Sequence, residues 1–237
     1  MKLMVDRSAY AIGVVGRLGE AILEALIGCA RYGAVHVATR APLSSTLGKL
    51  QPCPLTLESS NAAISSPIDD VYCCTDLRPG FHGRDRAYLR ATAADLPAIA
   101  RLTRAAGAKR FVLVTALAPL DQLSAPERGV RDEFELALVE AGFGTLVLLR
   151  PADSGQPASG NPLERIVLGM GNVLAGYLIP QSMQPLRPSL VARAALEAVE
   201  SLGPGTHVLN APGIRKLLKL EEQPGWLRRR AKGKDEG

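Results

Sequence analysis

Apolar and polar positions alternate along the chain with two different periods. Short apolar runs predict buried strands, which cover residues 9–12, 34–39, 70–75, 110–115, 144–149 and 207–210. Apolar residues at helical spacing predict helices between them, at 18–26, 85–107, 127–142 and 188–202. Strands that alternate with helices pair in parallel through right-handed crossovers, which place helices on both faces of the sheet. The pattern therefore predicts an α/β, doubly wound parallel sheet.

Weaker signals add detail to this outline. Residues 55–57 predict a short strand, and residues 163–178, apolar with several glycines, predict one or two further helices. Pro97 is expected to bend the second of the four predicted helices. Ser189 is expected to cap the fourth, because a hydroxyl at that position satisfies a free backbone N–H group.

Three glycines follow the first predicted strand at a three-residue interval. Gly13 suits the backbone of a tight turn, Gly16 allows a pyrophosphate to approach the main chain, and Gly19 allows close helix packing. The start of the following helix offers free N–H groups and partial positive charge to a phosphate. The spacing G-x-x-G-x-x-G differs from the usual G-x-G-x-x-G, so a plain strand-to-helix turn is the alternative. With the strands and helices around it, the turn predicts a dinucleotide site.

Other candidate site residues follow the predicted strands. Arg40 comes directly after the second strand, where dinucleotide folds meet the adenosine ribose, and an arginine there suits a 2′-phosphate. Arg40 therefore favours NADP over NAD, and a solvent-exposed loop arginine is the alternative. The carboxyl ends of parallel strands form one edge of the sheet. We expect the following residues along that edge: Gly13, Arg40, Cys74, Thr75, Thr115 and Arg150.

Composition narrows the class of protein. Of 237 residues, 47 % are apolar and 22 % charged, which is typical of a globular domain, and no apolar run is long enough for a membrane span. Asp6 and Arg7 interrupt the N-terminal segment, which has no hydrophobic signal sequence, so a cytoplasmic location is expected. The four cysteines have no metal-binding spacing, so we expect reduced thiols and no metal site.

The length suits one domain with a small appendage. Residues 1–220 are expected to form that domain, with residues 151–220 as a small C-terminal extension on the substrate side. Residues 221–237 are interpreted as a basic, flexible tail, because 226–234 contain five of the basic residues behind the net charge of +5. A nucleic-acid-binding tail is the less favoured alternative, since only one aromatic residue accompanies these charges.

Some reactive side chains are interpreted as structural. Cys73 and Cys74 are expected to be small core side chains, because neighbours on a strand point to opposite faces. His36, His82 and His207 match no nucleophile or metal pattern and are expected at ordinary strand or surface positions.

Five carboxylates are interpreted as solvated. Asp69 and Asp70 begin a predicted strand and are expected in a solvated turn. Asp132, Glu133 and Glu135 are expected on the wet face of a helix.

As a set, these motifs resemble the atypical short-chain dehydrogenase/reductases, nearest to the NmrA-like and Tat-interacting-protein-like NAD(P)-binding oxidoreductases. The resemblance covers about residues 8–218. It rests on GVVGRLG at 13–19, Arg40, DVYCCT at 70–75, RAAGAKRFVLVTAL at 104–117 and LLRP at 148–151. The later PSLVARAALEAVE at 188–200 also resembles a helix of the family.

The resemblance implies a Rossmann-type domain that holds NADP, with NAD as the alternative. Arg40 would bind the 2′-phosphate, Arg17 would add charge beside the pyrophosphate, and Thr115 falls where the family keeps its active-site serine. The residues placed around the cofactor are Gly13, Gly16, Arg17, Leu18, Gly19, Arg40, Cys74, Thr75, Thr115 and Arg150.

The sequence departs from the family at the catalytic pair. These enzymes commonly use a Tyr-x-x-x-Lys, in which the tyrosine transfers the proton and the lysine lowers its pKa. Here Arg131 aligns with the lysine and Glu127 with the tyrosine, and none of the tyrosines is followed by a lysine at the fourth position. Arg131 can anchor a ribose but does not exchange protons. In the glycine turn, Val14 and Val15 replace a smaller pair, which predicts crowding of the cofactor.

Three functions remain open at this point. The first is an NADP-dependent oxidoreductase with non-standard acid chemistry, in which Thr115, with Arg131, acts on an unknown small molecule. The second is a non-catalytic NADP-binding redox sensor or scaffold for a protein partner, which the missing tyrosine and lysine favour. A sugar-nucleotide epimerase is a third and weaker alternative, because it would normally need the same tyrosine.

Overall fold

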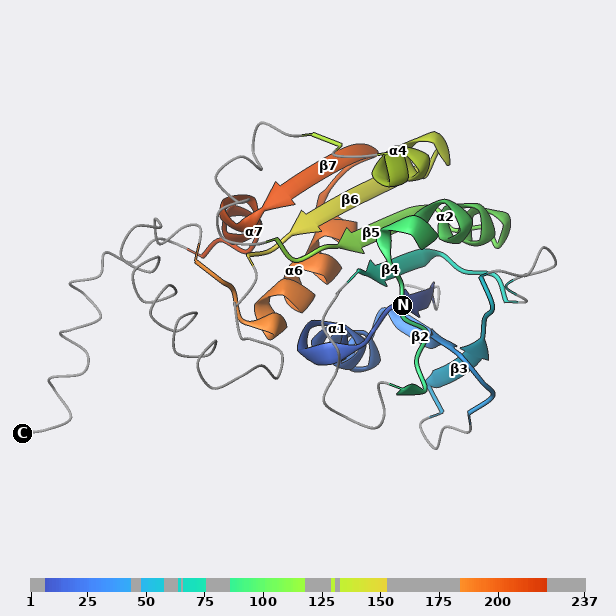
Figure 1. Ribbon diagram of the computed structural model, residues 1–237. Helices are drawn as coiled ribbons and strands as arrows, with labels where there is room; N and C mark the ends of the chain where they lie inside the picture. The colour runs from blue at the N-terminus through green and yellow to red at the C-terminus, as the bar shows by residue number, and fades with distance from the viewer. Residues whose placement is uncertain are drawn as a thin grey trace, which may run out of the picture.

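The computed structural model describes residues 7–43, 48–57, 64, 66–75, 86–117, 129–130, 133–152 and 184–220. Within them, seven parallel strands form one sheet in the order β3-β2-β1-β4-β5-β6-β7 (Figure 1). The strands are β1 (Arg7–Ile12), β2 (Tyr32–Thr39), β3 (Leu50–Pro54), β4 (Asp70–Cys74), β5 (Arg110–Val114), β6 (Thr145–Arg150) and β7 (Gly205–Asn210). The order reverses between β1 and β4, which is the point where open α/β sheets bind ligands.

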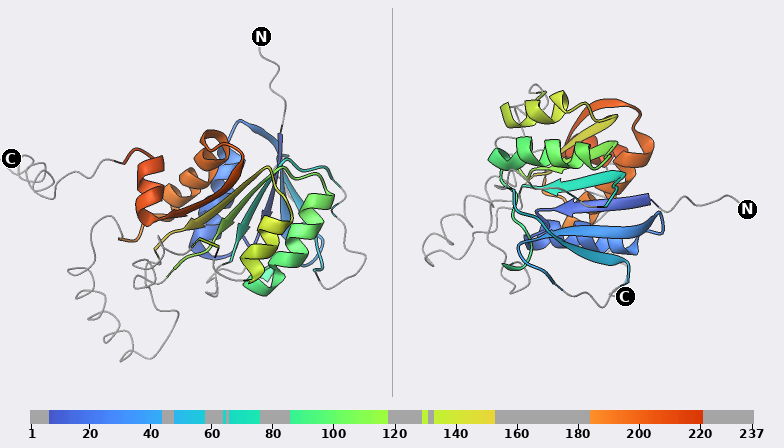
Figure 2. Two further views of the ribbon diagram at one scale, coloured as in Figure 1. Left: turned by 90° about the horizontal axis from the view of Figure 1, so that it is seen from above. Right: turned by 90° about the vertical axis from the view of Figure 1, so that its right-hand side faces the viewer.

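Helices cover both faces of this sheet. The helices are α1 (Gly16–Gly28), α2 (Leu96–Ala105), α4 (Glu133–Glu140), α6 (Pro188–Ser201) and α7 (Ala211–Leu217). Helices α1 and α6 pack against each other on one face, and α2 and α4 on the other (Figure 2). The predicted doubly wound, Rossmann-type fold is confirmed.

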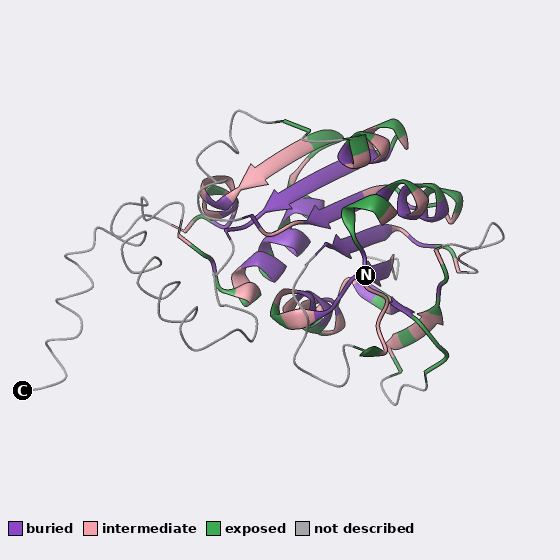
Figure 3. Cartoon of the chain, viewed as in Figure 1, coloured by how far each residue is buried: buried purple, intermediate pink, exposed green. Residues whose placement is uncertain are grey.

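The two faces have separate apolar cores. Alternate residues of each strand point to opposite sides, so that Val35 and Val37 join the core under α1 and α6, whereas Tyr10 and Ile12 join the core under α2. The central strand β4 is buried along its whole length (Figure 3), as expected for a parallel strand covered on both faces. Cys73 and Cys74 lie in the two different cores, which confirms their structural interpretation.

The helix predicted at 85–107 is shorter than expected. It begins only at Leu96, so Pro97 lies in its first turn and does not bend it. Pro is favoured there because the first N–H groups of a helix have no partner inside it. Thr92 and Asp95 form a reciprocal capping box around a short 3-10 turn just before it. Sequence periodicity alone did not reveal that the helix begins only after this capping box.

Other element boundaries also differ from the predictions. The strand expected at 55–57 lies a few residues earlier, as β3. Ser189 does not cap α6, because Arg187 is the N-cap residue and makes no side-chain cap bond. Helix α7 was not predicted, although Asn210 accepts a cap bond from the Gly213 N–H group at 3.1 Å.

The described part of residues 151–220 completes the main sheet. Helix α6 packs on α1 and against β5 and β6, and β7 pairs with β6 along six residues. The helix predicted at 163–178 and the tail at 221–237 lie outside the described residues. The expected role of this region on the substrate side therefore stays a prediction.

Candidate functional site

The turn between β1 and α1, residues 13–19, is called the glycine turn below. Gly13 and Gly16 both have positive φ, +69° and +67°. A Cβ at Gly13 would lie 2.0 Å from the carbonyl oxygen of Cys74, because the ends of β1 and β4 approach closely here. Only glycine fits such a turn, which agrees with the prediction for Gly13.

Helix α1 packs directly on the glycine turn. A Cβ at Gly19 would lie 2.4 Å from the carbonyl carbon of Val14, so Gly19 permits the close packing that was predicted for it. The N-cap residue of α1, Val15, makes no side-chain cap bond. The first N–H groups of α1 therefore receive no acceptor from the N-cap side chain, and N–H groups at a helix start attract an anion. The contact of Gly16 with a pyrophosphate stays a prediction.

The side chains of the glycine turn divide between core and surface. Val14 is buried in the core under α1, and Val15 is buried as well. Val14 packs inside the protein, and the crowding of a cofactor by Val14 and Val15 stays a prediction. Leu18 packs partly against the same core, and Arg17 is exposed on the first turn of α1.

Two threonines meet where β4 and β5 end. The Thr75 and Thr115 hydroxyl oxygens lie 2.6 Å apart, in a hydrogen bond that either one donates. The Thr75 N–H group donates to Val114 O and the Thr115 N–H group to Leu149 O, both at 3.0 Å, which continues the strand register. Thr75 is buried and Thr115 is half-buried. The structure thus brings together two predicted site residues.

The two predicted arginines have different surroundings. Arg40 is exposed at the end of β2, and its backbone N–H group donates to Ala87 O at 2.9 Å. Arg150 is only 1 % exposed and donates to Glu135 Oε2 at 2.6 Å and to Gly129 O at 2.8 Å. Arg150 therefore ties β6 to α4, and its contact with a cofactor stays a prediction. Glu135, expected on a wet helix face, is buried in this pair, so that expectation is wrong.

The expected catalytic helix is described only in part. Helix α4 is described from Glu133, and of the earlier part of the predicted helix only residues 129 and 130 are described, as bends. Arg131 and Glu127 lie outside the described residues, so their suggested positions in the site stay predictions. His82 also lies outside them.

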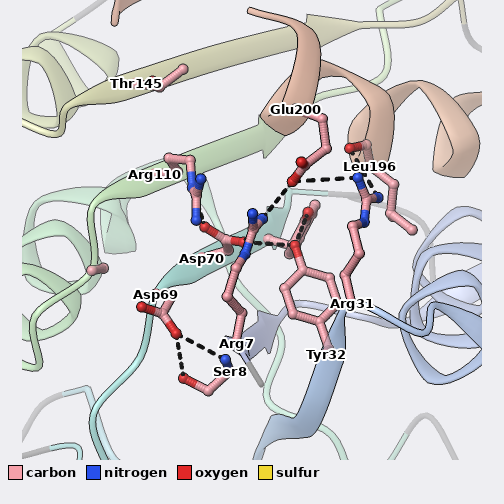
Figure 4. Close-up of polar contacts among 12 residues, drawn as sticks. Arg7, Ser8, Arg31, Tyr32, Asp69, Asp70, Arg110, Thr145, Leu196 and Glu200 are labelled. Carbon is pink, nitrogen blue, oxygen red and sulfur yellow. Dashed lines mark hydrogen bonds and ion pairs between the residues drawn. The ribbon is translucent and has the colours of Figure 1, made fainter. Parts of the chain in front are cut away.

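The opposite, amino-terminal edge of the sheet holds a buried ionic cluster (Figure 4). Asp70 is 0 % exposed and accepts hydrogen bonds from Arg7 at 2.6 Å, from the Tyr32 hydroxyl at 2.7 Å, and from Arg110. The Tyr32 hydroxyl also lies 2.7 Å from the Tyr72 hydroxyl. The expectation of a solvated turn at Asp70 is wrong, because three strand starts bring these partners around it.

Burial and charge set the ionisation of this cluster. Burial raises the pKa of Tyr32 and Tyr72, and the nearby Asp70 carboxylate raises them further. Glu200 of α6 accepts from Arg7 at 2.6 Å and lies 3.3 Å from Arg31, so α6 is tied to β1 and to the residue just before β2. These residues lie at the far edge from the glycine turn and have a structural role.

The buried His36 side chain predicts how the stability of the protein depends on pH. It is buried, stacks on Tyr10, and has its Nδ1 3.6 Å from Cys53 Sγ. Burial lowers the pKa of His36, so the unfolded chain takes up this proton first, below about pH 6.5. Stability should therefore fall as the pH drops below that value, and H36Q should lose less stability over the same interval. Urea unfolding near pH 7.5 and near pH 5.5 measures how much stability each protein loses between these pH values. An equal loss in the wild type and in H36Q would contradict the assignment to His36.

Two further findings concern the described residues. Among the described residues, no three His, Cys, Asp or Glu side chains are grouped so as to bind a metal ion. No helix in the described ranges combines the length and apolar character that a membrane crossing needs.

No family model and no curated protein matches the sequence. The fold is nevertheless shared with solved structures. A UDP-galactose 4-epimerase aligns with a TM-score of 0.50 and 12 % identity, over 86 % of this chain and 76 % of that one. A nucleoside-diphosphate-sugar epimerase from Staphylococcus aureus aligns with a TM-score of 0.50 and 14 % identity, over 86 % and 70 %.

A short-chain dehydrogenase from Burkholderia cenocepacia J2315, solved in complex with NADP, aligns over 96 % of this chain and 98 % of that one, with 16 % identity and a TM-score of 0.48. At these identities the likenesses describe the fold alone. The chain therefore shares the Rossmann-type fold of the two epimerases.

Proposed function

We propose that the protein binds NADP(H) across the carboxyl edge of its sheet and acts as an oxidoreductase similar to the atypical, NmrA-like short-chain dehydrogenases. The observation that carries this proposal is the glycine turn at the point where the strand order reverses. Gly13 has a positive φ there and lies against Cys74 O, and Gly19 brings α1 onto the turn. The N–H groups at the start of α1 would then face the position of a pyrophosphate.

The residues present fit such a cofactor. Gly16 and Arg17 would approach the pyrophosphate, and Arg40 would bind the 2′-phosphate of the adenosine. Cys74, Thr75 and Thr115 would border the nicotinamide half, since Cys74 ends β4 and the two threonines directly follow β4 and β5. When bound, the cofactor supplies hydride chemistry, and the protein orients the reactants.

The threonine pair supplies a hydrogen-bond donor at this edge. Two hydroxyls carry two protons, and the contact between Thr75 and Thr115 uses one of them. Thr115 is the more exposed member, so its hydroxyl is the one that would meet a carbonyl oxygen. Thr75 would then donate to Thr115 and orient it.

The alternative is a non-catalytic NADP-binding protein that senses redox state or binds a protein partner. The absence of any Tyr-x-x-x-Lys in the sequence favours it. NADPH consumption measured with a panel of aldehydes, ketones and quinones separates the two functions. Turnover that T115V lowers supports the oxidoreductase, and tight cofactor binding with no turnover supports the alternative.

A titration with NADPH and NADH, followed by fluorescence or calorimetry, tests the cofactor site itself. R40A should weaken NADPH binding about tenfold or more and leave NADH unchanged, because only NADPH carries the 2′-phosphate. R17A should weaken both nucleotides alike, because both contain the pyrophosphate. The wild-type protein binding neither nucleotide would contradict the proposed function.

A further inference from the structure

Three reactive side chains form a row across strands β1, β2 and β3, outside the residues assigned to the cofactor. Tyr10 of β1 pairs with His36 of β2, and Cys53 of β3 pairs with Ala38, two residues further along β2. Tyr10, Ala38 and Cys53 belong to or pack against the core under α2, so by strand alternation His36 points to the same face. Strand β3 is the last strand at this end of the sheet, so the row ends at a sheet edge.

The contact between Cys53 and His36 joins a thiol to a base. Cys53 Sγ lies 3.6 Å from His36 Nδ1 and 3.5 Å from Gln51 O. The thiol proton can point to either acceptor, but only the imidazole can take it away from the sulfur. His36 is 4 % exposed and stacks on Tyr10, which fixes the plane of its ring. A nucleophile, a base within reach and a group that orients the base are the parts of an activated cysteine.

Burial decides where the proton of this pair rests. It raises the pKa of Cys53 and lowers the pKa of His36, so that at neutral pH the thiol keeps its proton and the imidazole is uncharged. An uncharged imidazole that carries its own proton on Nε2 has an Nδ1 lone pair able to accept another. Since the thiolate is the nucleophile, a reaction at Cys53 requires His36 to take the thiol proton.

The other three cysteines lack this arrangement. Cys73 and Cys74 are buried in the two cores of the sheet. Cys29 is half-buried like Cys53, but its Sγ accepts from Arg31 Nε at 3.2 Å, and a guanidinium does not act as a base. Among the described residues, which include all four cysteines, Cys53 alone combines partial exposure with a basic side chain in contact.

We propose that Cys53 is an oxidation site for small hydroperoxides such as hydrogen peroxide, with His36 as the base that accepts its proton and returns it to the leaving group. Sγ attacks one peroxide oxygen, so that an S–O bond forms and the O–O bond breaks. The sulfur is oxidised to a sulfenic acid and the peroxide is reduced to water, because the thiol proton passes through His36 Nδ1 to the departing hydroxide. A small oxidant fits because Cys53 is half-buried between Pro52 and Pro54. The inference does not depend on the proposed cofactor site.

Trapping of the sulfenic acid with dimedone tests this site. The full-length reduced protein is treated with hydrogen peroxide and dimedone, and peptide mass spectrometry follows the label at each cysteine. Cys53 should be labelled about tenfold faster than Cys29, or more. H36Q should lower the rate at Cys53 about tenfold or more and leave the rate at Cys29 unchanged. H207Q is the matched control, because His207 contacts Gly203 O at 2.9 Å, and it should change neither rate.

Wild-type protein unfolded in urea supplies a measurement that needs no variant. Unfolding separates Cys53 from His36 and exposes all four cysteines, so the faster labelling of Cys53 relative to Cys29 should disappear. Equal rates at Cys53 and Cys29 in the folded protein would overturn the inference. It would also be overturned by an H36Q protein that is folded by circular dichroism and keeps the wild-type rate at Cys53, since exposure alone would then explain the label.

Discussion

Replacing Gly13 with alanine should lower the free energy of unfolding by about 3–5 kcal/mol and abolish NADPH binding. The new Cβ would lie 2.0 Å from the carbonyl oxygen of Cys74 and 3.1 Å from its carbonyl carbon. Both are backbone atoms of the central strand β4, which is held by β1 and β5 and cannot move aside cheaply. The positive φ of +69° adds a second cost for any residue with a Cβ. Urea unfolding followed by circular dichroism measures the loss.

Gly142→Ala is the matched control. Gly142 has nearly the same φ, +67°, but a Cβ there would meet no atom within 4 Å. G142A should lower the free energy of unfolding by about 1–2 kcal/mol, which is the cost of a positive φ at a residue with a Cβ, and should leave NADPH binding unchanged. Similar losses of unfolding free energy for G13A and G142A would mean that the close approach of β1 to β4 adds nothing to the effect of G13A.

The second large effect is expected at the opposite edge of the sheet. Asp70→Asn should lower the free energy of unfolding by about 3–5 kcal/mol, because it removes the charge that Arg7 and Arg110 surround. The Asp70 side chain is 0 % exposed, so water cannot replace it. Two cations would then lie close together without their shared carboxylate. The measurement is again urea unfolding, at neutral pH.

Glu200→Gln supplies the comparison for Asp70. Its carboxylate also accepts from Arg7 at 2.6 Å, but its side chain is 35 % exposed. An exposed pair contributes about 0–1 kcal/mol, so E200Q should change little. D70N that still folds should bind NADPH normally, since the cluster lies at the far edge from the glycine turn. Equal losses for the two variants would contradict the view that burial decides the difference.

The order of strands and helices could be read from the sequence because it depends on local pattern. The apolar runs around Val37, Tyr72 and Val112 are continuous, as strands buried on both faces must be. The glycine turn could be read for the same reason, since Gly13 and Gly19 are required by contacts within one strand–turn–helix unit and its neighbour. The start of α2 was missed because the helical period continues upstream of the capping box at Thr92.

The carboxylates show where sequence reasoning fails. Asp70 and Glu135 carry no local sign of burial, and each was expected in solvent. Asp70 is buried because parallel strands far apart in the sequence begin at the same edge and bring Arg7 and Arg110 to it. Glu135 is buried because Arg150, fifteen residues away, ends β6 beneath α4.

By itself, therefore, the sequence determined the fold class, the place of the glycine turn and the set of residues that follow the strands, because these depend on periodicity and on residues close in the chain. Only the tertiary structure decided which of those residues are available to a ligand. It pairs Arg150 with Glu135, joins the hydroxyls of Thr75 and Thr115, and leaves Thr39 buried without a partner among the described residues. Burial and partnership of a polar group depend on which distant segments pack around it, and strand pairing and helix packing bring those segments together.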